Sequence, residues 1–185
     1  MRIIAGTYRS RQLKSLKGLA LRPTSDMLRE TLFNILGPHV EGSRFLDLFA
    51  GTGAVGIEAI SRGASFVVFV ENHAPAIRLI HENLSLLGIE SGARVISSKA
   101  VAALAKLERN SAVAFDFIFL DPPYANEKEY KETLLALEKS RLAEDSAVVI
   151  AEHRKSFALP ASLGRLQQFR TLRQGDATLS FYRLA

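Results

Sequence analysis

The feature that most constrains the fold is a regular alternation of short apolar segments with amphipathic ones. Runs rich in β-branched and aromatic residues are separated by stretches whose apolar residues recur with a helical period. The apolar runs are 44–49, 66–70, 93–96, 115–120 and 147–151, and the helical stretches are 53–62, 74–87, 100–108 and 128–139. Strands and helices that alternate in this way form right-handed βαβ units. The sequence therefore predicts an α/β fold whose parallel sheet is covered by helices on both faces.

The two ends of the chain depart from this alternation. Residues 165–172 and 177–184 flank the turn dipeptide Gly175-Asp176, which predicts an antiparallel hairpin. Residues 2–13 predict a short β-ribbon, and Ser25 or Asp26 is expected to cap the helix that follows. We therefore expect a doubly wound, mostly parallel seven-stranded sheet of Rossmann-like type. A C-terminal antiparallel hairpin would close it, and the β-ribbon would precede it.

The net charge of the chain is concentrated at its N-terminus. The whole sequence carries a formal charge of +5 from 24 basic and 19 acidic residues. Residues 1–30 hold seven of the basic residues and two of the acidic ones, so this segment accounts for the whole excess. Charge concentrated on one segment is typical of proteins that bind polyanions. A solvated basic surface without a partner is the alternative.

Several classes of protein are disfavoured by what the sequence lacks. The chain has no cysteine, and the histidines at 39, 73, 81 and 153 show no metal-ligand spacing, so we expect neither disulfides nor a metal. The apolar runs are far shorter than the roughly 18 residues of a membrane-spanning helix. No secretory signal precedes Tyr8. We expect a cytoplasmic protein without a membrane partner.

A glycine-rich turn joins the first predicted strand to the first helix of the sheet. The segment LDLFAGTGAVG, residues 46–56, has glycines at 51, 53 and 56, where backbone can approach a ligand and a helix N-terminus offers N–H groups. A phosphate-binding P-loop is excluded, because Gly56 is followed by Ile57-Glu58 rather than by lysine and a hydroxyl residue. The glycines could also serve only close packing of the helix on the strand.

Two acids near this turn indicate which ligand it could take. In a dinucleotide site, Glu71 at the end of the second strand would bind a ribose. In an S-adenosyl-L-methionine site, Asp47 would also gain a partner, because the α-ammonium group could pair with an acid inside a strand that is costly to bury alone. Both interpretations remain open from the residues themselves. The candidate cofactor contacts here are Asp47, Phe49, Ala50, Gly51, Gly53, Glu71 and Asn72.

A second motif, FLDPPYAN at residues 119–126, follows the fourth predicted strand. It belongs to the same carboxyl edge of the sheet as the glycine turn. The motif Asp121-Pro122-Pro123-Tyr124 resembles the signature of methyltransferases that modify exocyclic amino groups of nucleobases. The resemblance implies that Asp121 and the Pro122 carbonyl accept the N–H groups of the target amine, and that Tyr124 stacks on the target base. Prolines suit such a loop, because they fix φ and have no N–H group. Asp121 is also a candidate cofactor contact.

Further segments extend the resemblance over nearly the whole chain. They are MRIIAG at 1–6, RPTSD at 22–26, RETLFN at 29–34, IEA at 57–59 and RGA at 62–64. All are similar to the RsmD family, bacterial methyltransferases that act on the 2-amino group of one guanine in small-subunit ribosomal RNA. This resemblance implies S-adenosyl-L-methionine as cofactor and ribosomal RNA, in the assembled or assembling 30S subunit, as partner. We expect the protein to act as a monomer.

The resemblance also divides the chain into two parts with different roles. Residues 1–24 are expected to form a basic arm that contacts RNA, and residues 25–185 the methyltransferase domain. The candidate RNA contacts are Arg2, Arg9, Arg11, Lys14, Arg22, Thr24 and Arg29.

One position departs from the family pattern. After the third strand the family usually has an amide or acid that accepts from the cofactor's adenine, whereas this chain has Lys99, which cannot accept a hydrogen bond. We therefore assign the adenine contact to Ser98 or to the backbone. The alternatives left open are an adenine-N6 methyltransferase acting on DNA or RNA, a nicotinamide-dependent oxidoreductase, and an RNA-binding module without catalysis.

Overall fold

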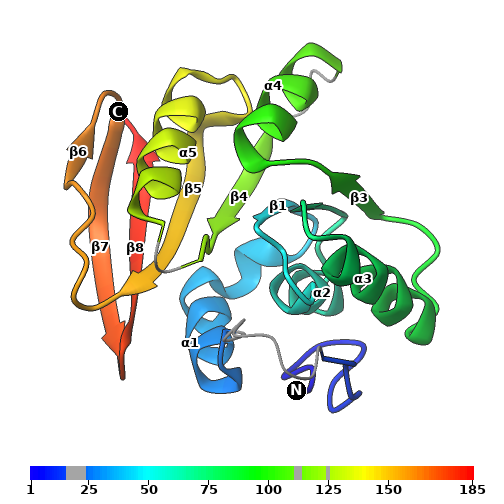
Figure 1. The fold of residues 1–185 in the computed structure, drawn as a ribbon. Helices are drawn as coiled ribbons and strands as arrows, with labels where there is room; N and C mark the ends of the chain where they lie inside the picture. Colours follow the sequence, from blue (N-terminus) through cyan, green and yellow to red (C-terminus); the bar gives the residue numbers. More distant parts are fainter. Residues whose placement is uncertain (16–23, 111–113, 124–125) are drawn as a thin grey trace. The chain divides into compact units, whose positions relative to one another are not determined.

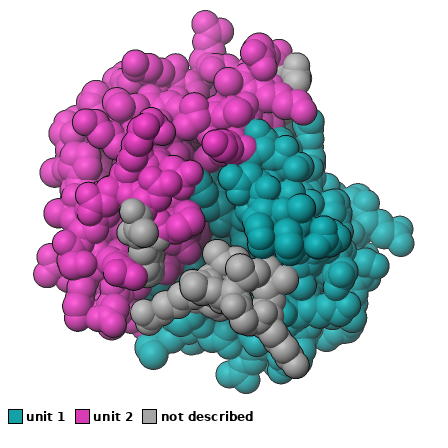
Figure 2. Space-filling model, in the orientation of Figure 1, with its two compact units in different colours: residues 1–98 teal, residues 99–185 magenta. Residues whose placement is uncertain are grey.

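The chain forms two compact units, residues 1–98 and residues 99–185 (Figures 1 and 2). This computed structural model describes residues 1–15, 24–110, 114–123 and 126–185. The expected division at residue 24 is a functional one, and the N-terminal segment lies within the first unit. Among the described residues, no helix is both long enough and apolar enough to cross a membrane.

The first unit contains a three-stranded parallel sheet with its helices. Along the chain it consists of α1 (Asp26–Leu36), the 3-10 helix η1 (Gly37–Val40), β1 (Arg44–Leu48), α2 (Ala54–Ser61), β2 (Phe66–Glu71), α3 (Ala74–Leu86) and β3 (Ala93–Ser97). The strand order is β3-β2-β1, and all pairs are parallel. The βαβ alternation predicted from the sequence is confirmed here.

The boundaries of α1 have a local cause. The Ser25 hydroxyl accepts the N–H of Leu28 at 3.1 Å, so Ser25 rather than Asp26 is the N-cap. The buried face of the helix carries Leu28, Leu32 and Leu36, as the helical period predicts. The stacked rings of Phe33 and Phe45 also connect the helix to β1.

The second unit contains one parallel strand pair followed by antiparallel strands. It consists of α4 (Ala100–Asn110), β4 (Phe115–Leu120), α5 (Glu127–Lys139), β5 (Ala143–Arg154), β6 (Ser162–Leu163), β7 (Leu166–Gln174) and β8 (Ala177–Leu184). The strand order is β4-β5-β8-β7-β6, with β4 and β5 parallel. The remaining pairs are antiparallel. The predicted C-terminal hairpin is therefore confirmed as β7 and β8.

Two details of the predicted architecture differ from the structure. The N-terminal β-ribbon is reduced to one antiparallel bridge between Arg2 and Gln12, because residues 5–10 form turns instead of paired strands. The described residues also contain eight strands rather than seven. The additional strand is the two-residue β6, which is too short to show any periodicity in the sequence.

Candidate functional site

The glycine turn leaves β1 through a series of left-handed residues. Phe49, Gly51 and Gly53 have φ angles of 62°, 54° and 78°, and Gly53 is the N-cap of α2. A side chain added at Gly51 would meet only the Phe49 carbonyl oxygen, at 3.9 Å. The backbone around Gly51 therefore leaves space for a close approach.

Gly56 has a different role from the two glycines before it. It lies inside α2, and a β-carbon at this position would collide with the ring of Phe69 in β2. Gly56 therefore permits close packing of the helix on the sheet. Close packing of the helix on the strand, which the sequence left open as the role of all three glycines, is the role of Gly56.

Asp47 is buried in β1, with 1% of its surface exposed. Its Oδ2 accepts the backbone N–H of Gly56 at 2.9 Å, so the carboxyl group caps the first turn of α2. Burial raises the pKa of Asp47 to about 7, and the nearby charge of Glu71 acts in the same direction. This side chain can therefore gain or lose a proton near neutral pH.

The raised pKa of Asp47 predicts a pH-dependent stability. Because the pKa in the folded protein is about 7 and the ordinary value is 3.8, folding favours the protonated form. The contribution of protonated Asp47 to stability is fully present below roughly pH 4 and is lost as the pH rises through about 7. We expect the stability of the ligand-free protein to fall over this range relative to Asp47→Asn, which retains an oxygen that can accept from Gly56. Denaturant unfolding at a series of pH values measures this, and parallel pH profiles for the two proteins would contradict it.

Glu71 connects the end of β2 to the glycine turn. Its Oε2 accepts the N–H of Gly51 at 2.8 Å, and its Oε1 accepts the N–H groups of Asn72 and His73, each at 2.8 Å. Each carboxylate oxygen can accept more than one hydrogen bond, so the group can still bind a sugar hydroxyl. The backbone N–H of Ser98 donates to the Glu71 carbonyl oxygen at 3.0 Å.

The predicted cofactor contacts of the first unit thus share one edge of its sheet. They lie at or just after the carboxyl ends of β1, β2 and β3, which are adjacent parallel strands. This is the edge at which α/β sheets bind ligands. The arrangement offers an acid, an open backbone turn and a second acid, in the order Asp47, Gly51 and Glu71.

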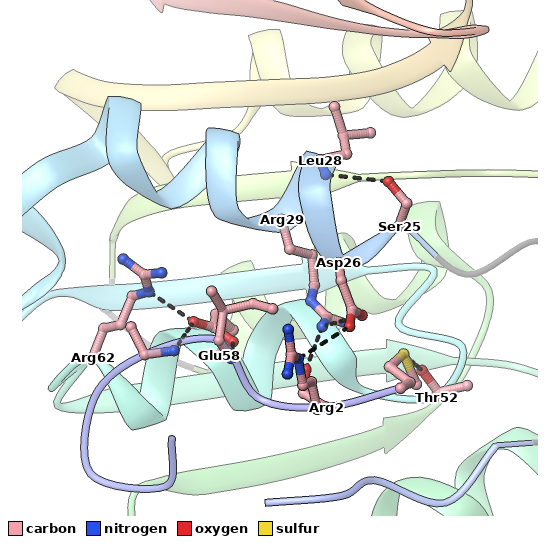
Figure 3. A network of polar contacts seen from close by, with 11 residues as sticks. Arg2, Ser25, Asp26, Leu28, Arg29, Thr52, Glu58 and Arg62 are labelled. Atoms are coloured by element: carbon pink, nitrogen blue, oxygen red, sulfur yellow. Dashed lines mark hydrogen bonds and ion pairs between the residues drawn. The ribbon is translucent and has the colours of Figure 1, made fainter. Parts of the chain in front are cut away.

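The N-terminal segment is attached to α2 by a buried carboxylate. Glu58 has no exposed surface, and it accepts the backbone N–H groups of Ile4 and Ala5 at 2.8 and 3.0 Å (Figure 3). It also forms an ion pair with Arg62 at 2.8 Å. A side chain at Gly6 would collide with the carbonyl of Ser61, so only glycine permits this close approach. The segment is therefore an integral part of the first unit.

Arg29 lies inside this network and not at the surface. Its side chain is fully buried, where Nη2 donates to the carbonyl of Arg2 and to Asp26 (Figure 3). Burial lowers the pKa of Arg29, while Asp26 and Glu58 oppose that shift. Such a side chain has no surface to offer a phosphate. The placement of Arg29 therefore conflicts with the predicted RNA contact, because the N-terminal segment covers it.

The other predicted RNA contacts divide into exposed and covered residues. Exposed side chains belong to Arg2, Arg9, Arg11 and Lys14, of which Lys14 pairs with Glu82 at 2.9 Å. Thr24 is buried. Arg22 lies outside the described residues.

Asn83 is a structural link that the sequence did not reveal. It is fully buried in α3, where its Oδ1 accepts the N–H of Lys14 at 2.9 Å. Its Nδ2 donates to the carbonyls of Lys14 and Thr52, at 3.2 and 3.1 Å. One side chain therefore connects the N-terminal segment to the glycine turn. The only signal in the sequence is an asparagine on the apolar face of a predicted helix.

The second unit carries the Asp-Pro-Pro motif immediately after β4. Asp121 is half-buried, Pro122 is buried and Pro123 is exposed. The hydroxyl of Tyr130 in α5 lies 3.2 Å from the Pro122 carbonyl oxygen. The predicted stacking residue, Tyr124, lies outside the described residues. Within the described parts of the chain, no cluster of histidine and acidic residues could hold a metal ion.

Known proteins related to this chain bear on what the arrangement does. A family model described as conserved hypothetical protein 95 matches residues 1–183. YlbH of Bacillus subtilis is 37% identical over 183 residues, which are 99% of this chain and 98% of that protein. Ribosomal RNA small subunit methyltransferase D of Escherichia coli K12 is 36% identical over 160 residues, 86% of this chain and 78% of that protein.

Solved structures show the same relationship. The yhhF protein of Escherichia coli superposes with a TM-score of 0.86 at 33% identity, covering 100% of this chain and 97% of that one. The ribosomal protein L11 methylase of Lactobacillus delbrueckii has a TM-score of 0.71 at 16% identity, over 96% of this chain and 87% of its own. The second likeness concerns the fold alone.

Proposed function

This chain belongs to the family described as conserved hypothetical protein 95, and we propose from that membership that it methylates the 2-amino group of a guanine in small-subunit ribosomal RNA. It is an rRNA methyltransferase by homology, and the methyl donor would be S-adenosyl-L-methionine. The observation that carries the proposal is the open glycine turn beside Asp47 and Glu71 in the first unit. The Asp-Pro-Pro motif after β4 in the second unit supports it independently.

The first unit supplies the groups that would hold the cofactor. Asp47 would pair with its ammonium group, and Glu71 would accept a hydrogen bond from its ribose. The open backbone at Gly51 would allow close approach, and Ser98 would contact the adenine. Because the relatives named as methyltransferases match most or all of this chain, this cofactor is favoured over a nicotinamide dinucleotide.

The second unit supplies the groups that would orient the target amine. An exocyclic amine is a weak nucleophile, because its lone pair is delocalised into the ring. Asp121 and the carbonyl of Pro122 would accept its two N–H groups, which directs the lone pair toward the methyl group. The cofactor provides an electrophilic methyl group, so most of the rate enhancement would come from positioning. The cofactor would supply the methyl group from its sulfonium, and the amine would give its proton to Asp121 or to water.

Transfer of labelled methyl to small ribosomal subunits tests the proposal. The subunits come from cells that lack the endogenous enzyme, and the labelled nucleosides are then identified. We expect label in N2-methylguanosine. Label in N6-methyladenosine, or transfer only to DNA, would assign the chain to the adenine alternative. Cofactor binding without any transfer would favour an RNA-binding module. A ribosomal substrate would place the protein, proposed to be a monomer, in the cytoplasm.

Cofactor binding is expected to release a proton near neutral pH. Without ligand, Asp47 has a pKa of about 7 and is partly protonated. A cation next to this carboxyl favours its charged form and lowers the pKa. Calorimetry at pH 7 in two buffers of different ionisation enthalpy measures the proton release. We expect Asp47→Asn to abolish it, and an equal release from this variant would contradict the role of Asp47.

Two exposed arginines of the N-terminal segment allow a test of RNA contact. Arg9→Gln and Arg11→Gln are each expected to weaken RNA binding and to reduce its salt dependence by about one unit of log–log slope. Arg94→Gln is the matched control, because Arg94 is exposed near the start of β3, away from the carboxyl edge. Deletion of residues 1–14 would be a poor test, since it uncovers Glu58. Unchanged salt slopes for both variants would refute the contact.

A further inference from the structure

The hairpin of β7 and β8 carries an exposed aromatic side chain that the proposed reaction does not use. Phe169 is 47% exposed. It lies where the register between β7 and β8 shifts, between Gln168 and Arg170, so it has no paired residue on β8. Bulges of this kind redirect a side chain and recur next to functional sites. The Phe169 ring leans on Phe181, with 6.2 Å between ring centroids, so it is held in place.

Two arginines lie against the rings of this aromatic pair. The guanidinium of Arg183 lies 4.5 Å from the centroid of Phe169, and that of Arg170 lies 5.9 Å from the centroid of Phe181. Both arginines are exposed. Residues 162–185 contain four arginines and a single acid, Asp176, which pairs with Lys155 at 2.7 Å. The hairpin is therefore positively charged around an exposed ring.

We propose that Phe169, Arg170 and Arg183, here called the hairpin surface, form a second contact for RNA. An unpaired base would stack on the Phe169–Arg183 pair, since aromatic rings and guanidinium planes both stack on bases. Arg170 and Arg183 would donate to the neighbouring phosphates. A protein partner fits less well, because the exposed apolar area is one ring rather than a continuous patch. This inference rests on the proposed function, which supplies RNA as the substrate.

Substitutions on the hairpin surface test this contact by RNA binding. Phe169→Ala is expected to weaken binding of a single-stranded fragment of the ribosomal RNA by about tenfold, and Phe169→Trp to restore it. Arg183→Gln should reduce the salt slope by about one. Val101→Ala is the matched control for the apolar loss, because Val101 is 43% exposed in α4 of the same unit. Arg141→Gln is the control for charge.

The possible outcomes separate the two proposals. RNA binding by the wild type that is unchanged in Phe169→Ala and Arg183→Gln would overturn the hairpin contact alone. Failure of the wild type to bind RNA at all would overturn the proposed function. Equal losses in the variants and in their controls would indicate general damage and would also count against the hairpin surface. If Phe169→Ala does not fold, Phe169→Trp and Arg183→Gln still decide the question.

A separate observation concerns the Asp-Pro-Pro loop itself. Tyr130 is 1% exposed, and its hydroxyl lies 2.8 Å from the carbonyl oxygen of Glu152 and 3.2 Å from that of Pro122. The hydroxyl donates to both carbonyl oxygens, and the shorter hydrogen bond goes to Glu152 in β5, so its single proton is shared between them. The Pro122 carbonyl is therefore held against the hydroxyl while it keeps capacity to accept another N–H.

The ring of Tyr130 is fixed by its aromatic neighbours. The ring centroids of Phe157 and His153 lie 5.3 and 6.5 Å away. His153 contacts the carbonyl of Arg154 through Nδ1, so that nitrogen carries the proton and Nε2 accepts from the hydroxyl of Ser180 at 2.9 Å. Burial lowers the pKa of His153, which keeps the ring neutral. The hydroxyl of Tyr130 therefore has little freedom to move.

We infer that Tyr130 is a positioning residue for methyl transfer, which it serves by orienting the Pro122 carbonyl. This inference also rests on the proposed function, in which that carbonyl accepts the target amine. A small displacement of a group that orients the reacting atoms lowers the rate strongly, whereas it leaves distant binding contacts unchanged. Removal of the Tyr130 hydroxyl should therefore lower turnover more than it lowers the affinity for the cofactor.

The chain contains a matched control for Tyr130. Tyr182 is also buried in the second unit, and its hydroxyl donates to the carbonyl of another proline, Pro160, at 3.0 Å. Tyr130→Phe is expected to lower kcat about tenfold with unchanged affinity for S-adenosyl-L-methionine. Tyr182→Phe should leave both unchanged. A wild-type kcat in Tyr130→Phe, or equal losses in the two variants, would overturn the role. An inactive wild type would instead overturn the proposed function.

Discussion

The Asp121→Ala variant is expected to lose methyl transfer while its fold remains intact. In the proposed mechanism, Asp121 accepts one N–H of the target amine and provides a site for the departing proton. Removing such a group typically lowers a rate by roughly 10²- to 10⁴-fold. Asp121 is half-buried at the end of β4, so its truncation leaves no large cavity. Single-turnover transfer of labelled methyl to small subunits measures the loss.

Two further variants make the test of Asp121 specific. Asp121→Asn retains one oxygen acceptor and should keep more activity than Asp121→Ala. Asp116→Ala removes an exposed carboxylate from the other end of the same strand and should be as active as the wild type. Cofactor affinity is measured in parallel, so that loss of binding is separated from loss of chemistry. Wild-type turnover in Asp121→Ala would refute the mechanism.

The Glu58→Ala variant is expected to lose about 3–5 kcal/mol of folding free energy, the range for breaking a buried ion pair from one side. The carboxylate has no exposed surface, and it holds two backbone N–H groups and the guanidinium of Arg62. Its loss would leave these donors unsatisfied. It would also remove a negative charge near the buried Arg29. Chemical denaturation monitored by circular dichroism measures the change.

The chain provides a matched control for Glu58. Glu132 is also a helical glutamate, and it forms an ion pair with Lys128, four residues before it, at 3.6 Å; both side chains of this pair are largely exposed. Exposed pairs contribute at most about 1 kcal/mol. Glu132→Ala should therefore change stability little. Similar losses in the two variants would show that burial of Glu58 has no energetic consequence.

The network around Glu58 changes how the N-terminal segment is understood. Its basic side chains fit the electrostatic role expected from the sequence, but its backbone belongs to the first compact unit. Through Asn83, the same segment is hydrogen-bonded to the glycine turn.

Much of the secondary structure was determined by local patterns in the sequence. The strand at 115–120 and the strand at 177–184 have the predicted bounds, because apolar periodicity and turn residues are properties of neighbouring positions. The predicted strand at 147–151 extends in the structure from Ala143 to Arg154. Its outer residues pair with other strands without a distinctive pattern of their own. β6 was missed because its two residues are too few to show a period, and residues 2–13 do not form a full ribbon because residues 5–10 form turns.

The sequence alone also placed Asp47, the glycine turn and Glu71 at strand ends, because strand boundaries and motif spacing are local. Only the tertiary structure decided what these groups contact, such as the N–H of Gly56 for Asp47 and that of Gly51 for Glu71. Arg29 and Glu58 resemble ordinary charges of surface helices when read along the chain. They are buried because a segment more than 20 residues away in sequence covers them. Burial, and with it the pKa of a side chain and its availability to RNA, depends on such distant contacts, which no local pattern records.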